Sequence, residues 1–474
     1  MAFAVLLALV MSMMPVTASA DTLIAVPVVS YTVSEPRTTY SGLQYQTYVV
    51  TGDPSNGYVL ILGHENAEIT SLQIPDTIEG YPVQEIQEYA FYGYENLTSL
   101  KLSKNTKTIG EAAFHYCTAL TSVTLPEGMK KLRNDVFGGC HSLAQVTLPS
   151  TLESIGYEAF HNCYALREIS LPQSLTEIGG RAFADCRALT ELNIPASVKS
   201  VGNNVVSGCD SLTALTVAPG NAHVRMENGL LIAGTSVVWV DPSISGACVV
   251  PQGVTAIADE VFFGCTGLTE ITLPEGLETI GYAAFSGCTS LKAINLPTTL
   301  TALEAQAFSD CTALEAIYLP DGLETLSSAA FKNCSSLTDI SLPASLTKID
   351  GAAFYGCTAL QEIRLPEGLT SLGSAVFQGC VSLETVNIPN QIKAISESLF
   401  QDCAALKAVE LPDSVTSIDL NSFAGCTALA QINFPERLAS ISYFAFQNCT
   451  SLDEVTFPAA LTLLGGYALR AAPV

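Results

Sequence analysis

Apolar residues recur along this chain with a period of 23 residues. Each unit reads L-x-x-V/I-x-L-P-x-x-L-x-x-I-G-x-x-A-F-x-x-C-x-x, as in the stretch from Leu360 to Cys380. The V/I-x-L step alternates with the period of two that is typical of a β-strand, and the proline that follows cannot donate another ladder hydrogen bond. The pattern therefore predicts one short strand in each unit.

The rest of the unit is too short for a full helix. The stretch from Leu369 through Gly373 to Phe377 is expected to form a turn or a single helical turn. One unit holds about eight apolar side chains, whose burial stabilises by roughly 1.5 to 3 kcal/mol each. This does not offset roughly 1 to 2 kcal/mol of backbone ordering for every residue. The units must therefore stack, with parallel strands, into a solenoid.

Cysteine marks the register of the stacked units. Three residues before each ladder cysteine stands a phenylalanine, with Val206 as the one substitute, and three residues after it stands a leucine. The ladder consists of Cys117, Cys140, Cys163, Cys186, Cys209, Cys265, Cys288, Cys311, Cys334, Cys357, Cys380, Cys403, Cys426 and Cys449. Successive members lie 23 residues apart except for one gap of 56.

This spacing of L-x-x-I-x-L-P with A-F-x-x-C resembles the BspA-type leucine-rich repeats of bacterial and protozoan surface proteins, over roughly residues 42 to 474. The resemblance implies an α/β-type leucine-rich repeat solenoid, predominantly β-strand and turn. The repeats are expected over residues 87–217 and 248–474. The motif is specific for fold and weak for ligand, because its consensus residues are the buried ones.

The gap of 56 residues marks an enlarged repeat. Its extra chain, residues 218–247, contains Asn228-Gly229 and an apolar run with Trp239, and it predicts a hairpin or loop carried on the solenoid. It is either a packing insert or a binding protrusion that presents Trp239. The phase of the repeat places Cys248 at a strand position, where it should stack between Leu215 and Ile271.

The two ends of the chain depart from the repeat. Residues 1–20 combine an apolar core with the small tripeptide Ala18-Ser19-Ala20 and predict a cleavable signal peptide, although the usual basic residue is missing. Residues 21–86 are expected to form a loosely ordered lead, to residue 41, and then a β cap on the first repeat. At the C-terminus the sequence is truncated, the last half repeat closes the core itself, or the end associates with another molecule.

Composition narrows the class of protein. With 48% hydrophobic and 14% charged residues, the chain must fold. Its formal charge of -25 argues against nucleic acid and anionic lipid as partners. No apolar run after residue 20 is long enough for a membrane-spanning helix.

The sequence offers little catalytic chemistry. No G-x-S-x-G, P-loop or H-E-x-x-H motif occurs, so we expect neither an enzyme nor a cofactor. The ladder supplies one sulfur in each repeat and no C-x-x-C pair, so no metal site is expected. Its cysteines are either free packing thiols or, in part, oxidised pairs. His115, His141 and His161 lie near the cysteine position of successive repeats and could approach one another.

A partner would have to use the exposed columns. A leucine-rich solenoid places its strands on the concave side, where the residue between V/I and L forms a central column. Tyr318, Arg364 and Glu410 interrupt its small polar residues at every second repeat, about 10 Å apart. They are either a binding patch or ordinary surface variation. Positive charge gathers in a basic patch of Lys104, Lys107, Lys130, Lys131 and Arg133, which is either a charged rim or a site for acidic glycans or an anionic wall polymer.

These features predict a secreted or cell-surface, non-enzymatic protein that binds an extracellular protein or glycan through its repeat surface. The family resemblance implies adhesion to host matrix proteins and to other cells. The alternative is a structural spacer or envelope scaffold without a dedicated ligand.

Overall fold

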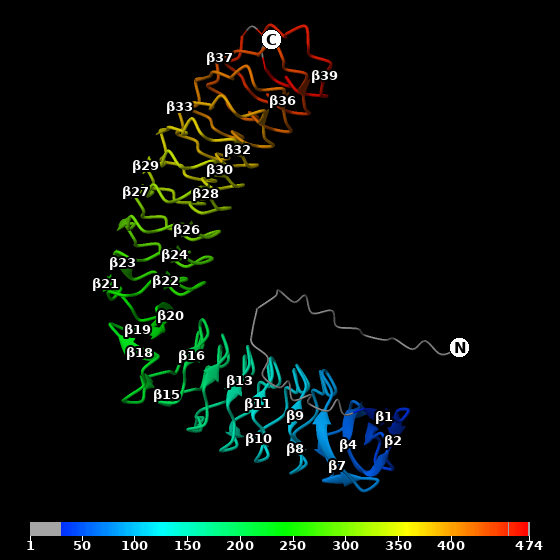
Figure 1. Cartoon of the computed structure of the whole chain (residues 1–474). Helices are drawn as coiled ribbons and strands as arrows, with labels where there is room; N and C mark the ends of the chain where they lie inside the picture. Colours follow the sequence, from blue (N-terminus) through cyan, green and yellow to red (C-terminus); the bar gives the residue numbers. More distant parts are fainter. Residues whose placement is uncertain (1–29, 454, 473–474) are drawn as a thin grey trace, which may run out of the picture.

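The computed structural model describes residues 30–453 and 455–472. Within these residues the chain forms strands and turns and no α-helix. The repeats stack into a solenoid that bends into an arc, with the N-terminal cap at one end and the last repeats at the other (Figure 1). The expected solenoid of 23-residue repeats is confirmed. The expected signal peptide, residues 1–20, lies outside the described residues.

Most V/I-x-L steps form the predicted strands, which lie side by side and parallel, although the described step at Ile169–Leu171 is not assigned as a strand. Val123 of one repeat pairs with Val146 of the next. These strands form the outer ladder: β5 (Ser71–Gln73), β8 (Ser99–Lys101), β10 (Ser122–Thr124), β12 (Gln145–Thr147), β15 (Glu191–Ile194), β17 (Ala214–Val217), β21 (Gly246–Val249), β23 (Leu268–Thr272), β25 (Ala293–Asn295), β27 (Ala316–Tyr318), β29 (Asp339–Ser341), β31 (Glu362–Ile363), β33 (Thr385–Val386), β35 (Ala408–Val409) and β37 (Gln431–Ile432).

A second ladder occupies the stretch for which the sequence predicted a turn or a single helical turn. It consists of two-residue parallel strands, the inner ladder: β9 (Thr108–Ile109), β11 (Lys131–Leu132), β13 (Ser154–Ile155), β14 (Glu177–Ile178), β16 (Ser200–Val201), β22 (Ala256–Ile257), β24 (Thr279–Ile280), β26 (Ala302–Leu303), β28 (Thr325–Leu326), β30 (Lys348–Ile349), β32 (Ser371–Leu372), β34 (Ala394–Ile395), β36 (Ser417–Ile418), β38 (Ser440–Ile441) and β39 (Leu463–Leu464). In the example unit, the stretch from Leu369 to Phe377 holds the two-residue strand β32 and then the expected turn, over 374–377. The alternative of a single helical turn is wrong.

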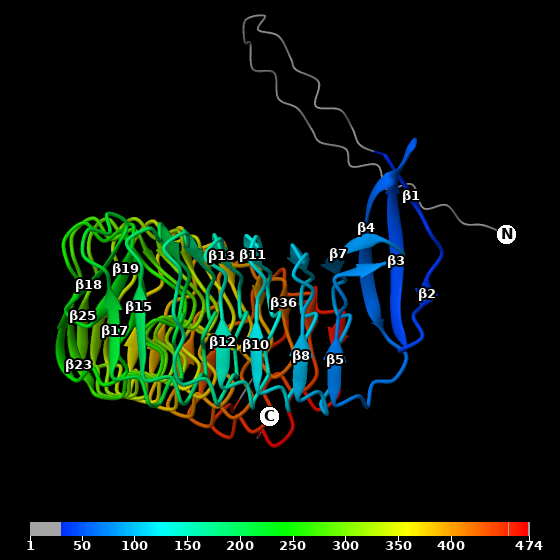
Figure 2. The ribbon, with the colours of Figure 1, turned by 90° about the horizontal axis from the view of Figure 1, so that it is seen from below.

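The placement of the two ladders also corrects the expectation that the V/I-x-L strands face the concave side. Figure 1 shows β8, β10, β15, β23, β27 and β29 on the outer side of the arc, and β9, β11, β16, β24, β28 and β30 on its inner side. Seen from below, β5, β8, β10 and β12 form the outer face of the N-terminal half (Figure 2). The central column of residues therefore lies on the convex face.

Between the ladders runs a column of stacked phenylalanines. Neighbouring rings from Phe91 to Phe183 and from Phe262 to Phe446 lie nearly parallel, with ring centroids 5.0 to 5.8 Å apart. The residue before each ladder cysteine has a positive φ, for example 60° at Asn162 and 73° at Gly379. Glycine, asparagine and aspartate tolerate this conformation best, and they fill most of these positions.

The cap is a mixed sheet in front of the first repeat. It contains β1 (Tyr31–Val33), β2 (Arg37–Thr38), β3 (Leu43–Val50), β4 (Asp53–His64), β6 (Thr77–Ile78) and β7 (Tyr81–Ile86). Strands β1 and β2 both pair with β3, so two short segments of the expected loose lead join the sheet, whereas the other described residues of 30–41 form no strand. Strand β7 pairs in parallel with β9, which connects the cap to the inner ladder.

The enlarged repeat forms an antiparallel sheet of β18 (Val224–Glu227), β19 (Leu230–Ala233) and β20 (Ser236–Val240). Its side chains alternate between two cores: Leu231 and Trp239 pack with the N-terminal repeats, whereas Leu230, Ile232 and Val237 pack with the C-terminal ones. Strand β20 then pairs with β22 of the inner ladder. The insertion is therefore a wedge between repeats.

The arc turns at this wedge. Strand β17 pairs with β15 and β21 pairs with β23, and no pairing joins β17 to β21 among the described residues. Cys248 accordingly pairs with Ile271, as expected, but not with Leu215. On the inner side, Arg181 Nη1 lies 3.1 Å from Glu260 Oε2, although the two residues are 79 positions apart. The wedge thus separates the outer strands of the two sets of repeats, whereas on the inner side residues from before and after the insertion contact each other directly.

Candidate functional site

The outer ladder exposes the residues on either side of each buried V/I. In β27, Ile317 is buried, whereas the neighbouring Tyr318 is 54% exposed. Tyr318 is in register with Asn295 on one side and with Ser341 on the other. The alternation within the strand thus presents the predicted central column to solvent.

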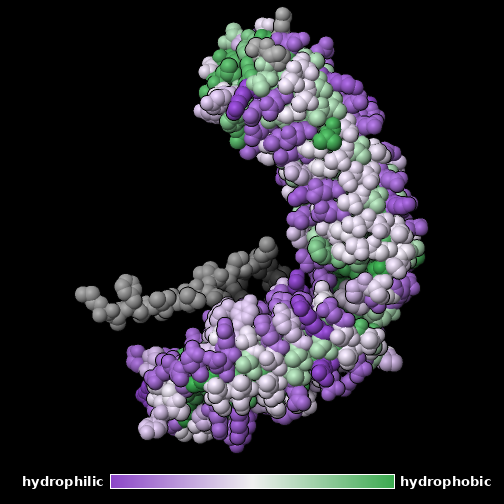
Figure 3. All heavy atoms as spheres, turned by 180° about the vertical axis from the view of Figure 1, so that it is seen from behind, coloured by the Kyte–Doolittle hydropathy of each residue, from purple (hydrophilic) through white to green (hydrophobic). Residues whose placement is uncertain are grey.

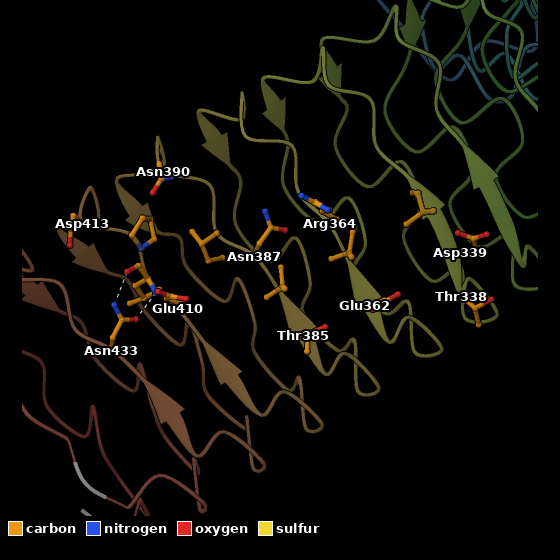
Figure 4. Close-up of a pocket in the computed structure, with 16 residues that line it drawn as sticks. Thr338, Asp339, Glu362, Arg364, Thr385, Asn387, Asn390, Glu410, Asp413 and Asn433 are labelled. Carbon is orange, nitrogen blue, oxygen red and sulfur yellow. Dashed lines mark hydrogen bonds between the residues drawn. The ribbon is translucent and has the colours of Figure 1, made fainter.

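A hollow of about 950 Å³ opens on this face over strands β29 to β37. Arg364 and Glu410 both line it, and Figure 4 shows their side chains together with those of Asn387 and Asn433. Tyr318 stands beside it, because its hydroxyl donates a hydrogen bond of 2.6 Å to Asp339 Oδ2, and Asp339 lines the hollow. The structure thus brings the three predicted residues to one region, which we call the outer hollow.

The outer hollow coincides with breaks in the strand ladder. Among the described strands, β29 is not hydrogen-bonded to β31, nor β33 to β35, whereas β31 pairs with β33 and β35 with β37. Beyond the end of each paired stretch, an asparagine side chain forms the hydrogen bonds to the neighbouring strand that backbone groups would otherwise form. Asn387 accepts a hydrogen bond from the Leu365 amide at 2.7 Å and donates one to the Leu365 carbonyl at 2.8 Å.

Asn433 holds Leu411 in the same way, with bonds of 2.6 and 2.8 Å. The two asparagines are two repeats apart, and they alternate with Arg364 and Glu410. The two-repeat alternation seen in the sequence therefore has a structural basis. One repeat supplies the bridging asparagine, and the next leaves a charged side chain free to point into the outer hollow.

The charges in the outer hollow are mixed but mostly negative. Its lining includes the carboxylates of Asp339, Glu362, Glu410 and Asp413, and the guanidinium of Arg364. Within the described part of the chain, neither Arg364 nor Glu410 forms an ion pair. Both side chains can therefore engage a partner without first breaking an internal pair.

The basic patch divides into two parts. Lys107, Lys130, Lys131 and Arg133 line a second hollow of about 890 Å³ beside strands β9, β11 and β13, on the inner face. Lys104 does not line it, and its Nζ lies 3.2 Å from Asp76 Oδ2 instead. The sequence showed these cations as one cluster, but only the inner-ladder register reveals which of them share a surface.

Trp239 is a packing residue. Its side chain is only 6% exposed, and it belongs to the core of the N-terminal repeats. The alternative in which the insertion projects Trp239 as a binding anchor is therefore wrong, because both faces of the inserted sheet are covered by repeats.

The ladder cysteines are buried free thiols. From Cys117 to Cys449, all but Cys265 donate a hydrogen bond of 3.0 to 3.3 Å to the carbonyl oxygen of the phenylalanine one repeat earlier. Burial raises the pKa of Cys265 to about 11 and that of Cys380 to about 12. A thiol in this environment stays protonated and is a poor nucleophile or metal ligand.

The three histidines of successive repeats do not form a common site. His115 lies 3.5 Å from Asp135, and His161 lies 3.5 Å from Asp185. His141 stacks on Tyr164, with ring centroids 4.6 Å apart. Within residues 30–453 and 455–472, no group of three or more His, Cys, Asp or Glu side chains is arranged to hold a metal ion. The same described residues include no helix with the length and hydrophobicity needed to cross a bilayer.

Two features of these surfaces were not predicted from the sequence: the inner ladder and the burial of the insertion on both of its faces. The inner ladder was not recognised, so the position of Tyr157 beside the basic residues was missed. The two-sided burial of the insertion was also missed, although its unbroken apolar run from Val237 to Val240 is a signal for it.

Comparison with known proteins agrees with the architecture. The family model of the BspA type leucine rich repeat region matches residues 84–213, 246–361 and 347–472, in six copies. No curated protein matches the chain.

Solved structures with a similar arrangement include three bacterial proteins. A leucine-rich repeat protein from Bacteroides ovatus is 26% identical, with 93% of this chain and 99% of that chain covered and a TM-score of 0.43. A leucine rich cell surface protein from Faecalibacterium prausnitzii is 24% identical, with coverages of 84% and 94% and a TM-score of 0.42. The pneumococcal vaccine antigen PcpA is 19% identical, with coverages of 91% and 98% and a TM-score of 0.44.

The family match extends over most of the chain and over both sets of repeats, on either side of the wedge. The chain belongs to the BspA-type leucine-rich repeat family.

Proposed function

We propose that this chain is an exported, non-enzymatic recognition and adhesion protein that binds an extracellular protein or glycan at the outer hollow. Membership of a family of repeat-containing surface proteins supports recognition in general. The sequence of residues 1–20 supports export to the medium or the cell surface.

The observation that carries the proposal is the chemistry of the outer hollow. Arg364 and Glu410 line an open surface without an internal ion-pair partner, and Tyr318 stands exposed beside it. Tyrosine and arginine are frequent energetic anchors of interfaces, because each combines a large contact area with hydrogen-bonding groups. The strand pairing is also interrupted on both sides of β31 and β33 in this region, so the hollow lies on an uneven part of the outer ladder.

The proposal is tested by binding of residues 21–474 to a panel of matrix proteins and glycans. A variant carrying Tyr318→Ala, Arg364→Ala and Glu410→Ala should bind its ligand at least about tenfold more weakly than wild type. The matched control carries Tyr116→Ala, Arg167→Ala and Glu168→Ala, three exposed residues outside the hollow, and should bind like wild type.

Equal binding by wild type and the hollow variant would show that the site is wrong. Absence of binding by wild type to every member of the panel would favour the structural spacer.

A further inference from the structure

The inner face of the N-terminal repeats concentrates positive charge in an acidic protein. The chain has 20 Lys and Arg residues against 45 Asp and Glu. Four of the cations, Lys107, Lys130, Lys131 and Arg133, nevertheless line the single hollow of about 890 Å³ described above. We call this surface the basic groove.

Three of the four cations are available to a ligand. Lys130 Nζ lies 2.7 Å from Glu153 Oε1 in an ion pair. Lys107, Lys131 and Arg133 are exposed and form no ion pair within the described residues. Lys131 and Arg133 belong to one repeat, in and directly after β11, and Lys107 belongs to the preceding repeat, directly before β9. All three line the same hollow, so their charges face one surface.

Glu85 shows how close these charges are. Burial raises the pKa of Glu85, and the positive charges of Arg133 and Lys107 act in the opposite direction. Glu85 is in register with Thr108 of β9, at the start of the basic groove. Glu85 does not line the groove, but its carboxylate is attracted by two of the cations that an anionic ligand would meet, so removing its charge would leave them more positive.

The groove also offers an aromatic surface. Tyr157 lines it and is 46% exposed. The backbone amide of Tyr157 donates a hydrogen bond of 2.9 Å to Asn134 Oδ1, which fixes its main chain beside Arg133. Gly156 and Gly179 also line the groove, and the backbone of the preceding repeat leaves no room for a side chain at either position. A tyrosine ring with an apolar face and a polar edge suits the face of a sugar ring.

We propose that the basic groove binds an acidic polysaccharide, in which carboxylate or sulfate groups meet Lys107, Lys131 and Arg133 and a sugar ring packs on Tyr157. Carboxylates at Glu111 and Glu177 also line the groove, so the positive stretch is short. A short stretch suits a polymer with about one charge for each sugar better than nucleic acid, whose dense charge the remaining acidic surface repels. This inference does not depend on the outer hollow.

The test uses residues 21–474 with heparin, polygalacturonate and, as a neutral control, dextran. Wild type should bind at least one of the two acidic polymers and not dextran, and binding should weaken as salt rises from about 50 to about 200 mM. Binding to heparin alone would assign sulfate as the recognised group, and binding to polygalacturonate would assign carboxylate.

Matched variants locate the site. Lys107→Gln, Lys131→Gln and Arg133→Gln together should reduce affinity at least about tenfold, because charge-assisted hydrogen bonds are the strong ones. Lys199→Gln, Lys292→Gln and Lys393→Gln remove the same charge from exposed positions outside the groove and should leave affinity within about twofold. Glu85→Gln should strengthen binding, which a variant that merely failed to fold could not do.

Four results would overturn the proposal: no binding of either acidic polymer at low salt, equal binding of dextran, equal loss in both triple variants, or tighter binding of duplex DNA than of the polysaccharides. Because every substitution lies outside the outer hollow, these results are independent of the binding test of Tyr318, Arg364 and Glu410.

Discussion

At the scale of single residues, the cysteine ladder combines packing with hydrogen bonding. The sequence could predict buried cysteines, because each stands between a phenylalanine and a leucine in a fixed register. It could not predict that Cys140 donates to the carbonyl of Phe114, since that contact depends on how one repeat sits on the last. The thiol thus satisfies a carbonyl oxygen inside the core, and an alanine in place of the cysteine would leave that oxygen without this donor.

Buried thiols make the fold sensitive to alkali. In the unfolded chain a thiol ionises near pH 8.5, whereas burial raises the pKa of Cys248 and Cys265 to about 11 and that of Cys380 to about 12. Above about pH 9 the unfolded state therefore holds fewer protons than the folded state. Stability should fall as pH rises, by up to about 1.4 kcal/mol per pH unit for each thiol.

Urea midpoints followed by circular dichroism at about pH 7, 9 and 10 measure this loss. A variant with Cys334→Ala, Cys357→Ala and Cys380→Ala should be less stable at neutral pH but lose stability less steeply with rising pH. Parallel pH profiles for the two proteins would contradict the burial of these thiols.

At the scale of elements, the sequence predicted the outer strands because V/I-x-L carries its own alternation. The inner strands have only two residues, and a single apolar position such as Ile155 carries no period. They form because stacking places Ile155 beside Ile178. The breaks in the outer ladder beside the outer hollow are likewise invisible in one repeat, and so is the bridging role of Asn387 and Asn433 within the strand pairs between those breaks.

The bridge at Asn387 should stabilise the outer ladder. Replacing it by alanine in Asn387→Ala removes two hydrogen bonds to Leu365 and should lower the free energy of unfolding by about 1 to 3 kcal/mol. Asn387→Asp should also destabilise, because a carboxylate cannot donate to the Leu365 carbonyl.

Thr147→Ala, in the same column, is the control, since Thr147 forms no side-chain hydrogen bond within the described residues. Urea denaturation measures all three variants. If Asn387→Ala lowered the free energy of unfolding by no more than Thr147→Ala does, the hydrogen bonds from Asn387 to Leu365 would not contribute to stability.

At the scale of the whole molecule, one spine supports two separate surfaces. The wedge of β18, β19 and β20 covers the hydrophobic core of each half of the solenoid. The column of phenylalanines is interrupted there, with Val206 at the phenylalanine position, but Val206 is itself buried. The direction of the bend could not be predicted, because it depends on which ladder the wedge opens. The space-filling view shows hydrophilic side chains spread along the arc, with hydrophobic ones in small scattered groups (Figure 3).

We propose that a ligand is recognised at the outer hollow of the solenoid. Hydrogen exchange of residues 21–474, with and without a bound matrix protein or glycan, tests it most directly. We predict that binding slows exchange in strands β29 to β37 and in the turns that follow them, and leaves the inner ladder of the same repeats unchanged. Protection confined to the inner ladder of these repeats, or spread evenly over the arc, would contradict the claim.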